Sequence, residues 1–281
     1  MPSTLFERML ENYDTSNSEA YLAATREVMQ KFALAGLHRS GFFETAAFYG
    51  GTALRLLYDL DRTSEDMDFS LLTPSKDFSL QPCFQALTEE FLLAGREITI
   101  TEKKKSAETA INSAFLKDTT RLYDLTGNLM PTVRIKIEVD TLPPPLFKTD
   151  YRLCMLPYSF MVRCYTLPSS FAGKMSALLY RGWKNRVKGR DWYDFEWYVR
   201  NGVAMNLQHF NARAQQIAKA EEDFTEQAFR ELLYAKIDST DFEKVKLDVQ
   251  PFINDAAKLE IWGSDYFKQV ASLMKISASE E

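Results

Sequence analysis

The sequence lacks any apolar stretch long enough to cross a bilayer, and its N-terminus lacks the pattern of a secretory signal peptide. It also has few sulfur and nitrogen ligands for metals. Cys83, Cys154 and Cys164 have no metal-binding spacing and leave an odd thiol in any disulfide scheme, which favours a reducing cytosol. His38 and His209 are far apart and have no cysteine partners, so no zinc site is predicted. We therefore expect a cytoplasmic protein with no membrane partner.

Positive charge is not in excess either, since the formal net charge of the chain is −5 at pH 7. This balance argues against general coating of nucleic acid but permits a local basic patch. The 281 residues are 46% hydrophobic and 26% charged, and they contain no internal repeat or low-complexity segment. These values predict a packed globular core in one large domain or two intimate ones.

Hydrophobic periodicity predicts a mixed N-terminal half and a helical C-terminal half. The expected elements are helices up to about Phe43, a strand, turn, helix and strand over 44–72, a helix over 80–95, strands over 97–101, 109–116 and 133–140, and two short strand-like runs over 153–166. From Leu167 onward the pattern is helical, with Pro168 at a helix start and Ser169 or Ser170 as its cap. We expect an α+β fold with domains 1–166 and 167–281.

The most informative stretch joins a glycine pair to two closely spaced carboxylates. An apolar run ends at Gly50 and Gly51, a short helical segment follows, and Asp66 and Asp68 come next in a predicted strand. Residues i and i+2 of a strand point to the same face, so these carboxylates repel each other unless a cation lies between them. Mg²⁺ takes such oxygen ligands together with phosphate oxygens. Glycines at a strand-to-helix turn let backbone N–H groups approach a phosphate.

Residues 133–140 alternate strictly between apolar and polar side chains, which predicts a strand with one polar face. The polar set is Arg134, Lys136, Glu138 and Asp140. A strand with one wet face is the simplest interpretation. Next to Asp66 and Asp68, however, such a face could supply a third metal ligand, and both Glu138 and Asp140 are candidates.

The start of the helical half is the densest basic and aromatic stretch of the chain. Lys174 lies inside an otherwise apolar helix, where a lysine must either reach solvent or meet an anion. Further basic residues alternate with aromatic ones, a mixture that suits phosphate contacts and base stacking. The basic candidates for RNA binding are Arg181, Lys184, Arg186 and Lys188, which follow Tyr180 and surround Trp183. A solvated loop between helices is the competing interpretation.

These motifs together resemble the AbiEii-type nucleotidyltransferase toxins, which include the MenT-type toxins and belong to the DNA polymerase β-like superfamily. The residues that carry the resemblance are Gly50, Gly51, Thr52, Ala53, Leu54, Arg62, Ser64, Asp66, Asp68 and Phe69. A Lys-X-acid motif of the family matches Lys136 and Glu138, although the family more often has aspartate as the acid. A later lysine and an Arg-Asp-X-X-Asp helix start match Lys174, Arg190, Asp191 and Asp194.

The resemblance implies a nucleotidyltransferase fold, a mixed small sheet with flanking helices, and a C-terminal helical bundle that contributes to the active-site cleft. It implies transfer of a nucleoside monophosphate from a nucleoside triphosphate, for some members to the 3′ end of tRNA or another RNA, and a cognate antitoxin as partner. The implied catalytic residues are Asp66, Asp68, Glu138, Lys174 and Asp191. The implied nucleotide-binding residues are Gly50, Gly51, Thr52, Lys136, Lys174, Arg190 and Asp194. The implied ligands of two Mg²⁺ ions are Asp66, Asp68 and Glu138 or Asp140.

Several alternatives stay open at the level of sequence. Asp191 and Asp194 share one helical face and could cap the helix, or hold Lys174 or Arg190 in place, as readily as act directly. The same fold could carry a kinase-like phosphotransferase or a nucleotidyltransferase that modifies small molecules such as antibiotics. A non-catalytic binding toxin is the third possibility, and the intact carboxylates argue against it.

Overall fold

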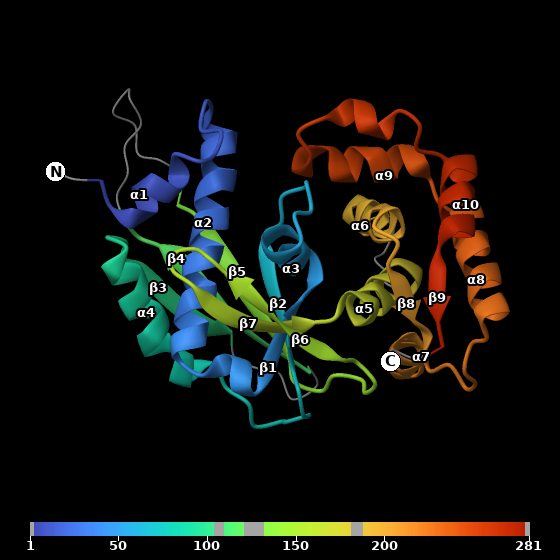
Figure 1. Cartoon of the computed structure of the whole chain (residues 1–281), viewed down its shortest axis with the longest axis horizontal. Coiled ribbons are helices and arrows are strands. Elements are labelled where there is room, and N and C mark those ends of the chain that lie inside the picture. The colour runs from blue at the N-terminus through green and yellow to red at the C-terminus, as the bar shows by residue number, and fades with distance from the viewer. Residues whose placement is uncertain (1–2, 104–109, 121–131, 181–187, 279–281) are drawn as a thin grey trace. The chain divides into compact units, whose positions relative to one another are not determined.

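The computed structural model describes residues 3–103, 110–120, 132–180 and 188–278 (Figure 1). None of the helices in these ranges combines the length and the apolar character needed to cross a membrane. The chain forms two compact units. Unit 1 consists of Met1–Asp59, Thr63–Pro143 and Asp150–Cys164, and unit 2 consists of Leu60–Arg62, Pro144–Thr149 and Tyr165–Glu281. The sequence pattern does not predict that residues 60–62 and 144–149 belong to unit 2.

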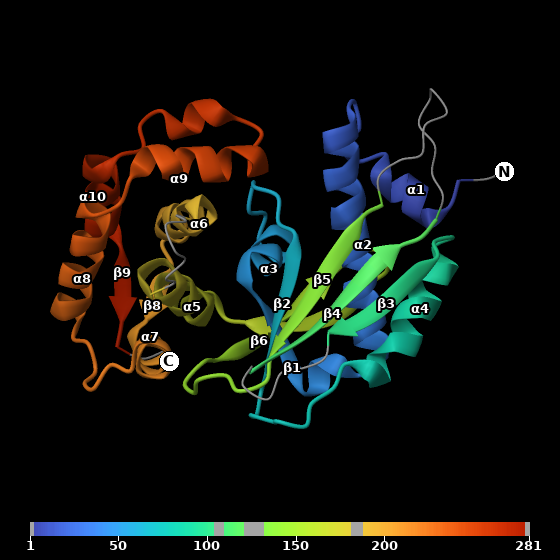
Figure 2. The same cartoon turned by 180° about the vertical axis from the view of Figure 1, so that it is seen from behind.

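A mixed sheet of seven strands, in the order β3-β4-β5-β2-β1-β7-β6, is the frame of unit 1 (Figure 2). Its strands are β1 (Ala46–Tyr49), β2 (Asp66–Leu71), β3 (Ile98–Lys103), β4 (Ile111–Asp118), β5 (Arg134–Asp140), β6 (Thr149–Cys154) and β7 (Phe160–Tyr165). The central pair, β2 and β5, is parallel, and so is the pair β1 and β7. The pairs β1–β2, β3–β4 and β4–β5 are antiparallel. The α+β fold class predicted from the sequence is confirmed.

The helices of unit 1 are α1 (Leu5–Leu10), α2 (Ser18–Arg39), α3 (Gly50–Leu57) and α4 (Phe84–Leu93), with 3₁₀ turns at Phe42–Glu44 and Gln81–Cys83. α2 begins at Asn17, whose side chain accepts a hydrogen bond from the backbone N–H of Ala20, as an N-cap residue should. α2 packs against α4, and Gly36 permits this close crossing because a Cβ there would lie 2.9 Å from Cα of Leu87. Both helices cover one face of the sheet (Figure 1).

The core of unit 1 follows from the alternation that the sequence predicts. The apolar residues of β2 and β5 are buried in one cluster with residues of α2 and α4. Phe69 of β2 stacks on Phe48 of β1 at 4.8 Å between ring centroids and meets Phe42 edge-on at 5.1 Å. Burial of such rings on one face of the sheet leaves the polar side chains of β2 and β5 on the other face.

Unit 2 is mostly helical. Its helices are α5 (Leu167–Tyr180), α6 (Gly189–Arg200), α7 (Leu207–Ala218), α8 (Glu226–Asp238), α9 (Phe242–Val249) and α10 (Ser264–Leu273), with 3₁₀ turns at Gln250–Phe252 and Ala256–Leu259. Two short strands, β8 (Ala204–Asn206) and β9 (Lys275–Ser277), pair in parallel, which the helical pattern does not predict.

The start of α5 corrects one expectation. The hydroxyl of Thr166, rather than that of Ser169 or Ser170, accepts a backbone hydrogen bond at this end, from the N–H of Ser169 at 3.4 Å. The predicted cap was therefore misplaced by three or four residues, because Pro168 occupies the first turn of the helix instead of preceding it.

A cluster of aromatic rings forms the interior of unit 2 around α6. Trp192 meets Phe242 of α9 and Phe267 of α10 edge-on, with centroid distances of 5.0 and 4.9 Å. α6 approaches α9 closely at Gly189, where a Cβ would lie 2.9 Å from the backbone nitrogen of Val249 and still closer to the carbonyl oxygen of Val245. Backbone atoms cannot move aside as a flexible side chain can, so this position requires glycine.

We predict that Gly189→Ala destabilises unit 2 by about 1–3 kcal/mol, the usual cost of overpacking a well-packed interior. Gly173→Ala is the matched control, because a Cβ at this helical position meets only Arg213, at 3.8 Å or more, and should be neutral or slightly stabilising. All four tryptophans lie between residues 183 and 262, so tryptophan fluorescence during urea denaturation follows unit 2. Equal urea midpoints for Gly189→Ala and Gly173→Ala would contradict the close approach of α6 to α9 at Gly189.

Candidate functional site

The two aspartates of β2 lie on the polar face of the sheet in unit 1. Asp66 is exposed and Asp68 is half-buried, whereas Met67 and Phe69 between and after them are fully buried. The strand therefore points both carboxylates away from the core, as the i, i+2 spacing predicts.

The parallel pairing of β2 with β5 places polar residues directly opposite these aspartates. Asp66 is paired with Lys136, and Asp68 is paired with Glu138. Nζ of Lys136 lies 2.6 Å from Oε1 of Glu138, in an ion pair that is partly open to solvent. Asp140 lies two pairs further on, opposite Ser70, and its carboxylate accepts a hydrogen bond from the N–H of Leu142 at 3.0 Å. Of the two candidate third ligands, Glu138 is the one opposite Asp68.

Gly50 connects β1 to α3 and touches the carboxylate of Asp68. Its φ of +83° is in the left-handed region, and a Cβ on this residue would lie 2.7 Å from Oδ2 of Asp68. Both facts require glycine at this turn. The N-cap residue of α3, Tyr49, makes no side-chain capping hydrogen bond. The first N–H groups of a helix have no partner within the helix, so the first turn of α3, which begins beside Asp68, is suited to bind an anion.

Thr52 does not present its hydroxyl to solvent. Its side chain is fully buried, lies 2.8 Å from the hydroxyl of Ser64 and donates to the carbonyl oxygen of Asp66. The amide of Gln30 in α2 donates to the carbonyl oxygens of Ser64 and Glu65, both at 3.0 Å. These contacts from α2 and α3 hold the chain where it enters β2, so Thr52 positions Asp66.

The donor set of this face suits a hard divalent cation. Carboxylate oxygens are the ligands that such cations take in proteins. Asp66, Asp68 and Glu138 supply only oxygen ligands from two adjacent strands in register. Within the described ranges no three carboxylate, imidazole or thiolate groups already converge as a preformed metal cluster. The residues therefore fit Mg²⁺ in chemistry and register, and Glu138 would have to leave Lys136 to take part.

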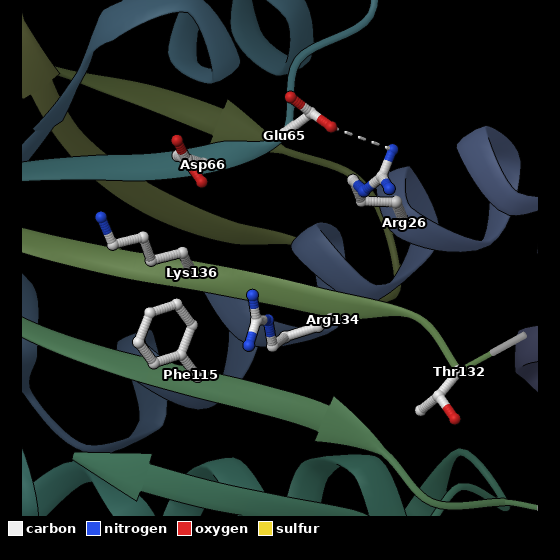
Figure 3. Close-up of a pocket in the computed structure, with 7 residues that line it drawn as sticks. All are labelled: Arg26, Glu65, Asp66, Phe115, Thr132, Arg134 and Lys136. Atoms are coloured by element: carbon white, nitrogen blue, oxygen red, sulfur yellow. Dashed lines mark ion pairs between the residues drawn. The ribbon is translucent and has the colours of Figure 1, made fainter. Parts of the chain in front are cut away.

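A pocket of about 530 Å³ opens beside Asp66 on the same face (Figure 3). Its lining residues are Arg26 of α2, Glu65, Asp66, Phe115 of β4, Thr132, and Arg134 and Lys136 of β5. Arg134 lies over the ring of Phe115 at 4.6 Å, and Arg26 approaches Glu65 at 3.9 Å. Arg26, Phe115 and Thr132 are not among the site residues predicted from the sequence. Alternation in the sequence placed Arg134 on this face and could have placed Phe115 there, but no sequence pattern pointed to Arg26.

Unit 2 holds a separate cluster of four charges, of which Arg62, Asp191 and Asp194 are buried and Lys174 is 13% exposed. Nζ of Lys174 lies 2.8 Å from Oδ1 of Asp191 and 2.7 Å from Oδ2 of Asp194. Arg62 donates two parallel hydrogen bonds to Asp194, each of 2.7 Å, and is only 2% exposed. Two cations therefore compensate two carboxylates. Arg62 was grouped with the aspartates of β2 by the sequence motif, but the structure places it in unit 2.

The charges in this cluster stabilise one another. Burial alone would lower the pKa of Lys174, but Asp191 and Asp194 outweigh burial, so the pKa of Lys174 is raised. Burial alone would raise the pKa of Asp194, but Arg62 and Lys174 hold this pKa below its ordinary value of 3.8. Arg62, Lys174 and Asp194 therefore stay charged at neutral pH.

The sequence left open whether Asp191 or Asp194 caps α6, and the structure answers this. The N-cap position belongs to Lys188, whose side chain makes no capping bond, while the N–H of Gly189 donates to Asp248 of α9 at 2.8 Å. Arg190 lies over the ring of Phe252 at 4.0 Å. Of the basic RNA-binding candidates, Arg181, Lys184 and Arg186 lie outside the described residues, so their role stays a prediction.

Comparison with protein families identifies the chain. Residues 33–271 match the family described as "Nucleotidyl transferase AbiEii toxin, Type IV TA system", which is more than half of the sequence. The chain belongs to the AbiEii family. The resemblance inferred from the sequence motifs is thereby confirmed. A comparison with curated proteins found no match.

Three solved structures are similar to this AbiEii chain over most of its length. MenT4, a nucleotidyltransferase toxin from Mycobacterium tuberculosis H37Rv, has a TM-score of 0.59 and 16% sequence identity, covering 96% of this chain and 88% of its own. Another solved structure, from H. pylori, has a TM-score of 0.53 and 17% identity, covering 89% of this chain and 93% of its own. JHP933 from Helicobacter pylori has a TM-score of 0.52 and 17% identity, covering 89% of this chain and 90% of its own. At these identities the likeness shows a shared fold.

We predict that Arg62→Met destabilises unit 2 of this AbiEii chain by about 3–5 kcal/mol at pH 7, because Asp194 loses one of its two buried cations. The low pKa of Asp194 gives stability that is present above the unfolded value of 3.8 and is lost as the pH falls through the folded value. The difference between variant and parent should therefore shrink below about pH 4. Urea denaturation followed by tryptophan fluorescence across this pH range measures it.

The matched control is Arg200→Met. Arg200 is 52% exposed and only approaches its carboxylate partners, Glu196 at 3.8 Å and Asp61 at 4.0 Å. Its loss should cost less than about 1 kcal/mol at any pH. If both arginine variants lose the same stability, the buried cluster does not contribute as the geometry indicates.

Proposed function

We propose that this AbiEii chain is a Mg²⁺-dependent nucleotidyltransferase toxin that transfers a nucleoside monophosphate from a nucleoside triphosphate to an RNA hydroxyl, with the 3′ end of tRNA as the expected acceptor. One observation carries the proposal. Asp66 and Asp68 share a face of β2 with Glu138 directly opposite Asp68, and Gly50 at the N-terminus of α3 touches Asp68. This arrangement sets metal-binding oxygens beside an anion-binding turn. A cognate antitoxin is the expected protein partner.

Each residue on this face has a distinct role in the proposed reaction. Asp66, Asp68 and Glu138 would hold Mg²⁺, which neutralises phosphate charge and favours ionisation of the acceptor hydroxyl. The N–H groups of Gly50 and Gly51 bind the outer phosphates of the nucleotide. Lys136, directly opposite Asp66, adds a positive charge near the α-phosphate when it leaves Glu138. Thr52 orients the start of β2 from within the fold.

Two carboxylate substitutions test the proposal directly. Asp66→Ala and Asp68→Ala should each reduce transfer at least a thousandfold and remove toxicity in cells, because metal-bound oxygens stabilise charge that develops in the transition state. The fold should survive, since two like charges side by side repel each other without a cation. The assay incubates total RNA with each nucleoside triphosphate in turn, labelled on the α-phosphate, and denaturation checks the fold.

Parallel reactions with the label on the γ-phosphate distinguish nucleotidyl transfer from phosphoryl transfer, and antibiotic acceptors test the small-molecule alternative. Full transfer by either alanine variant would remove the metal site from the proposal.

The third ligand can be assigned with a matched pair of isosteric substitutions. Glu138→Gln should abolish transfer, because residue 138 lies opposite Asp68. Asp140→Asn should retain most activity, because this carboxylate lies opposite Ser70 and accepts the N–H of Leu142. The rate of transfer at saturating Mg²⁺ and the Mg²⁺ concentration needed for half that rate are the measurements. The reverse result would assign the ligand to Asp140.

The family resemblance also assigns Lys174 to the triphosphate, and this stays a prediction. Lys174→Ala should weaken binding of nucleoside triphosphate and lower transfer strongly while leaving affinity for RNA nearly unchanged. Lys174→Arg keeps the positive charge among Asp191 and Asp194, so it separates a loss of fold from a loss of binding. Calorimetric titration with a non-hydrolysable nucleotide measures the first effect. A variant that binds nucleotide normally but loses RNA affinity would place the lysine on the other substrate.

A further inference from the structure

The pocket beside Asp66 continues a row of residues that crosses three strands. Asp66 of β2 is paired with Lys136 of β5, and Lys136 is paired with Phe115 of β4. Arg134 stands two residues before Lys136 and therefore on the same face. Figure 3 shows the side chains of Phe115, Arg134 and Lys136 grouped below Asp66, with Glu65 and Arg26 to the right of Asp66.

The lining of the pocket combines positive charge with one aromatic ring. Three cations, Arg26, Arg134 and Lys136, line it against the carboxylates of Glu65 and Asp66. Arg134 is exposed and lies over the ring of Phe115, with Cζ 4.6 Å from the ring centroid, and among the described residues it makes no ion pair that would occupy its guanidinium group. A guanidinium placed over a ring can still donate hydrogen bonds to a phosphate, and it loses little entropy on binding.

The carboxylates divide this face into two sides. Strand β1 and the Gly50 turn of α3 lie on one side of β2, and β5 and β4 with the pocket lie on the other.

In nucleotidyl transfer the acceptor oxygen forms a bond to the α-phosphorus while the bond from this phosphorus to the bridging oxygen of the β-phosphate breaks. Pyrophosphate leaves with that electron pair, and the proton of the acceptor hydroxyl passes to water. Attacking and leaving oxygens are in line, so they lie on opposite sides of the α-phosphate.

We propose that the Arg26–Phe115–Arg134 pocket binds the end of the acceptor strand, a single-stranded polynucleotide, with Arg134 on the phosphodiester next to the acceptor hydroxyl. The proposal rests on the proposed function, because the Gly50 turn must hold the leaving phosphates for the pocket to face the acceptor. A volume of about 530 Å³ exceeds what one phosphate needs and is within the range of pockets that hold a small ligand, so one terminal nucleotide fits. Phosphate contacts from arginine and an adjacent ring match the chemistry of single-strand binding.

The test measures binding without transfer. Arg134→Gln should weaken binding of a short fluorescent single-stranded RNA about three- to tenfold and flatten the slope of log affinity against log salt by about 0.7, the value for one lost phosphate contact. Phe115→Leu, which keeps apolar bulk but removes the ring under Arg134, should weaken binding in the same direction. A DNA oligonucleotide of the same sequence distinguishes the two kinds of strand, and the pocket is assigned to the strand whose binding responds to the substitutions.

Arg152→Gln is the matched control. Arg152 is also an exposed strand arginine over an aromatic ring, Tyr58 at 4.7 Å, but it belongs to the edge strand β6 and does not line the pocket. It should bind both oligonucleotides as the parent does. Equal affinities and salt slopes for the Arg134→Gln variant and the parent would overturn the proposal.

The proposed function is tested apart from this inference. If the parent transfers no nucleotide to any acceptor, the proposed function fails whatever the binding data show. If the parent transfers nucleotide and Arg134→Gln changes neither oligonucleotide affinity nor the apparent KM for RNA, only the pocket assignment fails. A change confined to the KM for the nucleoside triphosphate would also overturn it, because the pocket would then hold the donor.

Discussion

The register between β2 and β5 is the constraint on which the candidate site depends. Side chains of a strand alternate between faces, so a slip of one residue would turn Asp66 and Asp68 into the core and Met67 and Phe69 out to solvent. Burial of Phe69 among other aromatic rings opposes such a slip strongly. The apolar face of the sheet therefore fixes the chemistry of the polar face: the packing that stabilises unit 1 also sets Asp68 opposite Glu138.

Local patterns were sufficient to predict much of this arrangement. The alternation in residues 133–140 gave the strand and its polar face, and the i, i+2 spacing gave the common direction of Asp66 and Asp68. The glycine at position 50 was informative because a turn with φ of +83° beside a carboxylate accepts no other residue without strain. These features depend on a few neighbouring residues, and periodicity and turn chemistry report on such short distances.

Other features depend on contacts between distant parts of the chain, and no local pattern encodes them. Arg62 is four residues before Asp66 in the sequence, but it pairs with Asp194, 132 residues later, inside unit 2. Arg26 reaches the pocket from α2, which the helical pattern alone could not orient toward β2. Thr52 matched a phosphate-binding motif in sequence, whereas the fold buries its hydroxyl against Asp66. Spacing predicts which face of an element a residue occupies, but it does not predict which distant element packs against that residue.

The two kinds of ion pair in the molecule differ in how easily they can be exchanged. The pair of Lys136 with Glu138 is 30% and 25% exposed, and a pair in contact with water contributes about 0–1 kcal/mol, so Glu138 can leave Lys136 for a metal at little cost. Asp194 itself is fully buried and its partners Arg62 and Lys174 are only 2% and 13% exposed, so breaking a pair leaves an uncompensated charge that costs about 3–5 kcal/mol. The ion pair of Glu138 is therefore weak enough to be exchanged for the Mg²⁺ of the proposed reaction. Asp191 and Asp194 are suited to keep Lys174 charged and fixed in direction.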